Sequence, residues 1–114
     1  MRVTTDFFVS ALLRRVNGSG GMAVLGRKGA SEAGAVFVKF RRPDRMFDLF
    51  GPAVQSAYDD EVTERAFQVY ASAADEPEGD ARLARERQWD PDLWIVEIET
   101  WRGSASDLIL VLAD

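Results

Sequence analysis

Two segments of the chain, residues 35–42 and 93–100, alternate their side chains with the two-residue period of a β-strand. In each segment one set of alternate positions is apolar, and the other set changes from apolar to charged along its length. The apolar sets are Val36, Val38 and Phe40 in the first segment, and Trp94, Val96 and Ile98, followed by Thr100, in the second. We expect both segments to be strands that turn these sets toward a common core.

The charged positions of the two segments have opposite signs. The first segment carries Lys39 and Arg41, and the second carries Glu97 and Glu99. If the two strands are neighbours in a sheet, these residues can pair across it. The pattern therefore predicts ion pairs on the outer surface of the sheet.

Shorter patterns predict the remaining strands and the first helix. Apolar residues at i, i+4 spacing predict a helix over Asp6–Val16, with Thr5 or Asp6 as its N-cap and Gly18 as the left-handed residue after its end. Further strands are expected at residues 22–27, 46–50 and 65–71, and residues 51–64 read as a long loop.

A second helix is expected before the last strand. Pro77 suits its first turn, acidic residues come early in it, and three arginines come late. Its apolar side is thin, which is typical of a surface helix. The segment Asp90–Asp92 ends it, and we expect Trp89 to pack over the helix end.

These elements predict a single α+β domain. The expected architecture is a mainly antiparallel four- to five-stranded sheet, with an N-terminal helix packed on one face and a second helix before the last strand. The domain is assigned residues 1–103, and residues 104–114 form an apolar tail that adds a strand or contacts a partner chain. The candidate contact residues of the tail are Leu108, Ile109, Leu110, Val111 and Leu112.

Composition narrows the possible functions. The 114-residue chain has no cysteine and no histidine, which excludes disulfides, thiolate metal sites, cysteine nucleophiles and histidine-based catalytic triads. It shows no signal-peptide pattern and no apolar run near the ~20 residues that span a bilayer. We therefore expect a cytoplasmic protein without a membrane partner or a cofactor.

Charge is unevenly distributed along the chain. Residues 1–57 hold nine basic and four acidic residues, a net +5, whereas residues 58–114 hold five and fifteen, a net −10. Either the two halves fold against each other and neutralise, or the first half forms a nucleic-acid-binding surface, against which the acidic pI of 4.7 argues. The candidate residues for that surface are Arg27, Lys28, Lys39, Arg41, Arg42 and Arg45.

Four acidic residues surround the start of the last predicted strand and could ligate a metal: Asp90, Asp92, Glu97 and Glu99. The Cα atoms of Glu97 and Glu99 are expected about 6.6 Å apart, two positions along a strand. That spacing admits a water or a hard cation, as hydrolysis requires. The simpler interpretation is that both glutamates form ion pairs.

Four stretches in this order, "FFVSALLRR", "GAVFVKF", "LFGPA" and "RERQWDPDLWIVEIE", resemble the bacterial family called domain of unknown function 1491. The resemblance covers roughly residues 2–102, and the last stretch is its most specific part. It implies a small bacterial α+β domain. Because that family has no assigned activity, the resemblance supplies no catalytic or binding residues.

The missing catalytic residue types favour a non-catalytic interaction or regulatory module over an enzyme. Its expected partner is another protein or a second copy of the chain, as a homodimer. Two alternatives remain: a nucleic-acid-associated protein with a basic N-terminal surface, and a metal-dependent hydrolase with an acidic cluster.

Overall fold

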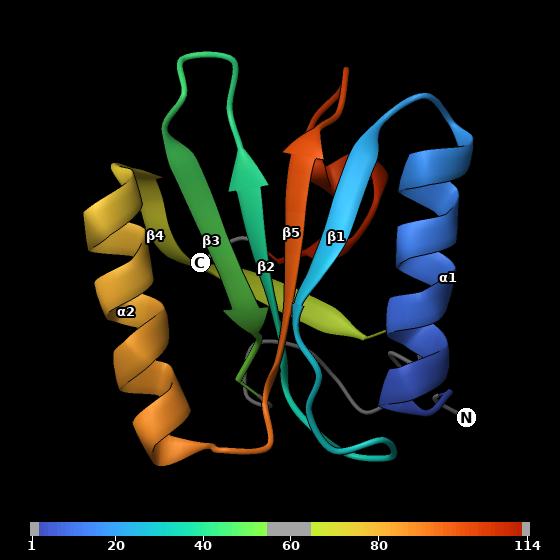
Figure 1. Ribbon diagram of the computed structural model, residues 1–114, viewed down its shortest axis with the longest axis vertical. Coiled ribbons are helices and arrows are strands. Elements are labelled where there is room, and N and C mark those ends of the chain that lie inside the picture. The colour runs from blue at the N-terminus through green and yellow to red at the C-terminus, as the bar shows by residue number, and fades with distance from the viewer. Residues whose placement is uncertain (1–2, 55–64, 113–114) are drawn as a thin grey trace.

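The computed structural model describes residues 3–54 and 65–112 (Figure 1). Within these ranges the chain forms two α-helices, a six-stranded sheet and a short 3₁₀ helix. In chain order the elements are α1 (Thr5–Gly18), β1 (Met22–Arg27), β2 (Val36–Arg41), β3 (Phe47–Pro52), β4 (Ala66–Ala74), α2 (Glu76–Trp89), β5 (Trp94–Thr100), η2 (Ala105–Asp107) and β6 (Leu110–Val111). The predicted loop 51–64 begins within β3, and its residues 55–64 lie outside the described ranges.

The sheet has the order β1-β5-β2-β3-β4-β6 and is mixed. The α+β class is confirmed. The predicted sheet is partly inaccurate: it has six strands rather than four or five, and although three of its pairs are antiparallel, β2 pairs with β5, and β4 with β6, in parallel. The crossover through α2 inserts β5 between β1 and β2, and such a helical crossover is what joins strands in parallel. The two-residue β6 is too short to show a periodic pattern.

The predicted pairing of the two alternating segments is confirmed. Val38 lies opposite Val96 in the parallel β2–β5 pair. Both are fully buried, and Trp94 is only 2% exposed. Trp94 also donates a hydrogen bond from Nε1 to the Ala30 carbonyl at 2.7 Å. The apolar sets of both strands therefore form the centre of the main core.

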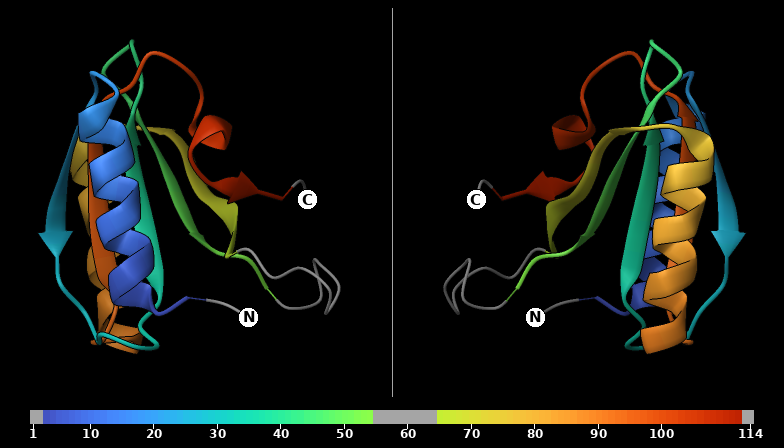
Figure 2. Two further views of the ribbon diagram at one scale, coloured as in Figure 1. Left: turned by 90° about the vertical axis from the view of Figure 1, so that its right-hand side faces the viewer. Right: turned by 90° about the vertical axis from the view of Figure 1, so that its left-hand side faces the viewer.

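The sheet is strongly twisted, and different elements pack on its two faces (Figure 2). On what we term the inner face, α1 and the segment from η2 to β6 pack over the main core. On the outer face, α2 packs over β3 and β4 with a smaller cluster formed by Phe37, Leu49, Leu83 and Leu93. The two helices thus cover opposite faces (Figure 1).

The start of α1 differs from the prediction by one residue. Thr4 is the N-cap, and its Oγ1 accepts a hydrogen bond from Phe7 N–H at 3.2 Å. Thr5 is instead buried and donates from Oγ1 to the Gly34 carbonyl at 3.0 Å. The helix runs on to Gly18, and the left-handed residue is Gly20, with φ of 86°. Tertiary hydrogen bonding thus decides which threonine caps.

The apolar C-terminal run packs on its own chain. Leu108 and Ile109 are buried in the main core. Leu110 and Val111 form β6 and lie opposite Ala66 and Phe67 of β4. The Leu112 N–H donates to the Phe67 carbonyl at 2.8 Å. The proposed partner contact is therefore mostly occupied within the chain.

The second helix begins and ends as predicted, since it runs from Glu76 to Trp89 with Asp90 as its C-cap. Asp75 caps it by accepting a hydrogen bond from Glu78 N–H, and Pro77 lies in the first turn. Leu83, 6% exposed, anchors it to the outer face. The packing predicted for Trp89 is wrong, since its side chain is 88% exposed. At 100° per residue, Trp89 points away from the side of α2 that carries Leu83.

Candidate functional site

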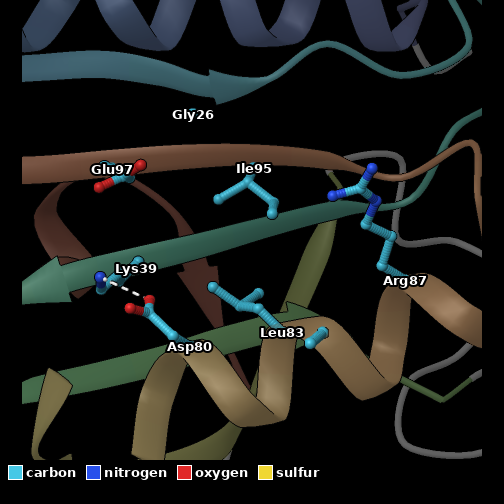
Figure 3. Close-up of a pocket in the computed structure, with 8 residues that line it drawn as sticks. Gly26, Lys39, Asp80, Leu83, Arg87, Ile95 and Glu97 are labelled. Carbon is cyan, nitrogen blue, oxygen red and sulfur yellow. Dashed lines mark hydrogen bonds and ion pairs between the residues drawn. The ribbon is translucent and has the colours of Figure 1, made fainter. Parts of the chain in front are cut away.

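A groove of about 210 Å³ lies on the outer face between α2 and the strands β5, β2 and β1 (Figure 3). We call it the α2–β5 groove. Four of its residues come from α2 at the spacing i, i+3, i+4 and i+7, which places them along one side of that helix. The lining residues are Gly26, Lys39, Asp80, Leu83, Ala84, Arg87, Ile95 and Glu97.

Lys39 lies at the bottom of the groove and ties β2 to α2. Its Nζ lies 3.1 Å from Asp80 Oδ1 and 3.4 Å from Glu76 Oε1, and 4.2 Å from the centre of the Phe47 ring. Burial lowers the pKa of Lys39, but the carboxylates around it, above all Asp80, outweigh this and raise the pKa above the ordinary 10.5. Lys39 is therefore a structural cation whose charge α2 already satisfies.

Glu97 lines the same groove from β5. A β-bulge in β1 places Gly26 beside it, where a Cβ atom would lie 2.5 Å from Glu97 Oε2. The missing side chain of Gly26 makes room for the carboxylate. Glu97 is partly buried and has no hydrogen bond or ion pair with any residue in the described part of the chain.

The two predicted cross-strand ion pairs have different outcomes. Arg41 Nε lies 2.9 Å from Glu99 Oε2, so this pair is confirmed. Lys39 and Glu97 are register neighbours, but no ion pair forms between them. The α2 carboxylates form the direct ion pairs with the lysine instead, and Glu97 contributes to the raised pKa of Lys39 only through its charge, without a hydrogen bond.

Arg87 lies at the end of the groove opposite Glu97, with Ile95 and Leu83 between them (Figure 3). Its side chain is exposed, and within the described residues it has no hydrogen bond or ion pair. The groove thus has an unpaired carboxylate at one end, an unpaired guanidinium at the other and an apolar middle. Such a surface can bind a cation, an anion and an apolar side chain together.

The six basic candidates do not form one surface. The ends of β1 and β2 place Arg27 and Lys28 at the opposite end of the sheet from Arg42 and Arg45 (Figure 1). Arg42 pairs with Asp44 and Asp48, and Arg27 donates to the Pro91 carbonyl. Lys39 and Arg41 pair with residues of the acidic half, as the interpretation of mutual neutralisation expects.

The four acidic candidates are also dispersed. Asp90 and Asp92 lie in the turn before β5, where Asp92 N–H donates to Asp90 Oδ1 at 3.0 Å. Glu97 lines the groove and Glu99 pairs with Arg41. Among the described residues, no three acidic, histidine or cysteine side chains are grouped so that they could hold a metal ion.

The sequence patterns did not predict that Asp80, Arg87 and Gly26 would line a site. Asp80 and Arg87 are seven positions apart on a helix, so the sequence alone indicates that they lie on the same side of it. What the sequence lacked was the strand that this side faces. The pairing of β1 with β5, which brings Gly26 to Glu97, joins positions about seventy residues apart.

Comparison with known proteins gives a family and close structural relatives. The family model "Protein of unknown function (DUF1491)" matches residues 3–106. A solution structure of a protein from A. tumefaciens is 44% identical, with a TM-score of 0.84, over 100% of this chain and 98% of that chain. A crystal structure of a DUF1491 family protein from Caulobacter crescentus is 36% identical, with a TM-score of 0.78, over 99% and 100% of the two chains.

Two further findings bear on the class of protein. No curated protein matches this chain. In the described ranges, neither helix has the length and apolar character that crossing a bilayer requires.

Proposed function

Because the chain belongs to the family described as "Protein of unknown function (DUF1491)", its function has to be argued from its own site, and we propose that it is a protein-interaction module whose contact surface is the α2–β5 groove. The proposal concerns binding between proteins and requires no reaction step. It makes the groove, rather than the basic or the acidic candidate residues, the functional surface.

The observation that carries the proposal is the unpaired carboxylate of Glu97. A partly buried charge has lost part of its hydration, and this cost is offset when an opposite charge or a hydrogen-bond donor binds it. Glu99, two positions along the same strand, has such a partner in Arg41. A lysine or arginine from a docked protein would complete Glu97 in the same way.

The size and lining of the groove also suit a protein partner. At about 210 Å³ it is smaller than the roughly 300–1,000 Å³ of pockets that enclose drug-sized ligands. It accommodates a few side chains from a docked surface instead. Val24, 47% exposed, lies opposite Glu97 in the β1–β5 pair and extends the apolar area beside the groove.

Site-specific photo-crosslinking in bacterial cells tests the proposal. A benzophenone amino acid at Ala84, which lines the groove, should give an adduct with another polypeptide, identified by mass spectrometry. Ala81 is the matched control, because it is an exposed alanine of the same helix outside the groove lining. The substitution Glu97→Arg should abolish the adduct at position 84. Equal adducts at both positions, or none at position 84, would refute the proposal.

A further inference from the structure

We infer that the partner of the α2–β5 groove is a second copy of this chain, docked about a twofold axis that passes near Ile95. The inference rests on the proposed function and names its partner. Its basis is the order of charges along the groove, with Glu97 at one end and Arg87 at the other (Figure 3). Both side chains lack an ion pair within the described residues.

A twofold axis reverses the direction of a linear patch, so each contact occurs twice. With the axis near the middle of the groove, Arg87 of one copy approaches Glu97 of the other, and the reciprocal pair forms as well. Ile95, between them, then lies near its own counterpart. The same patch therefore provides both halves of the complementary surface.

The groove also carries no net charge that would oppose self-docking. Its charged lining residues are two cations and two anions, namely Lys39, Arg87, Asp80 and Glu97. Lys39 and Asp80 neutralise each other at 3.1 Å. The net charge of −5 on the whole chain is thus not concentrated on this surface.

A partner of another sequence would need only a cation for Glu97. It would leave the position and the sign of Arg87 unexplained. Self-docking uses both unpaired charges, and it covers Val24, which shares the outer face with Glu97 because directly opposite residues in a sheet point the same way. The charge layout thus favours a second copy.

Charge reversal with recombination tests the inference. The wild-type chain, of 12.7 kDa, should approach twice that mass in sedimentation equilibrium as concentration rises. Arg87→Glu or Glu97→Arg alone makes both predicted contacts repulsive and should raise the dissociation constant at least about tenfold, the effect of about 1.4 kcal/mol. Mixing the two variants in equal amounts should restore the dimer, because one then presents two carboxylates and the other two guanidinium groups.

Arg85→Glu is the matched control, since Arg85 is an exposed arginine of α2 outside the groove lining. It makes the same charge change and should leave the dimer intact. A wild-type chain that stays monomeric up to millimolar concentration overturns the inference, as does a dimer that the mixed variants fail to restore. If the chain is monomeric while Ala84 crosslinks to a different polypeptide, the proposed function stands and the self-docking is wrong.

Discussion

The two faces of the sheet are built from the same strands but differ in how completely their side chains are satisfied. On the inner face, Val38 and Val96 are fully buried under α1 and the C-terminal segment. On the outer face, α2 covers β3 and β4, and near β1 an apolar side chain such as Val24 remains 47% exposed. At β2 and β5 the inner face is covered by other elements of the chain, whereas the outer face is covered over only part of its area.

The difference between the two faces separates the residues that stabilise the fold from the surface that we propose for binding. Burial of apolar area is the main favourable term in folding, so the inner face fixes the fold. The charged residues of the outer face contribute according to their partners. Lys39 pairs with carboxylates of α2 and Arg41 pairs with Glu99, whereas Glu97 has no direct ion pair in the described chain. The functional surface is therefore expected at the part of the outer face that remains unsatisfied.

The largest expected effect on the free energy of unfolding comes from a substitution in the core on the inner face. Trp94→Ala removes a side chain that is 2% exposed and the Nε1 hydrogen bond to Ala30, so it should lower the free energy of unfolding by about 3–5 kcal/mol. Ile95 follows Trp94 in the chain, but its partly buried side chain lies on the outer face. Ile95→Ala should therefore lower the free energy of unfolding by only about 1–2 kcal/mol. Urea unfolding of both variants measures the difference. Equal losses would contradict the contrast between the faces.

An intermediate effect on stability is expected from high pH, because Lys39, which pairs with carboxylates of α2, loses its charge there. The pKa of Lys39 is raised in the folded protein, so its contribution is fully present below the ordinary pKa near 10.5 and is lost as pH rises through the higher folded value. Over that interval wild-type stability should fall more steeply than that of Lys39→Met, by up to about 1.4 kcal/mol per pH unit.

Urea unfolding between pH 8 and 11.5 measures this difference in slope. Burial also raises the pKa of Tyr70, which titrates in the same range. Tyr70 is present in both proteins, so its contribution cancels in the comparison. Parallel stability curves for wild type and Lys39→Met would show that the Lys39 cluster does not stabilise the fold through charge.

The smallest expected effect separates the two glutamates of β5. Glu99→Gln weakens the partly buried pair with Arg41 and should cost about 1 kcal/mol, whereas Glu97→Gln removes an unpaired charge and should change stability by less than about 0.5 kcal/mol. The unfolding of both variants at dilution, where the chain is monomeric, provides the measurement. A larger loss for Glu97→Gln would mean that Glu97 has a structural partner.

Much of the sheet could be predicted because alternation along a strand is a local property. The inward-facing sets of residues 35–42 and 93–100, their adjacency and the Arg41–Glu99 pair are all confirmed. The groove could not be predicted, because it depends on where α2 lies. Trp89 shows the same limit, since its apolar character suggested packing but the helix turns it into solvent.

The sequence alone determined the α+β class, the positions of the main strands and helices within a few residues, and which side of β2 and β5 is buried. These features depend on periodicity, capping residues and turn residues, all of which act over a few positions. Only the tertiary structure decided the strand order of the mixed sheet, the choice of Asp80 rather than Glu97 as the direct ion-pair partner of Lys39, and the position of Gly26 beside Glu97. Those contacts join residues far apart in the chain, and the local pattern of a strand does not specify which distant segment approaches it or in which direction.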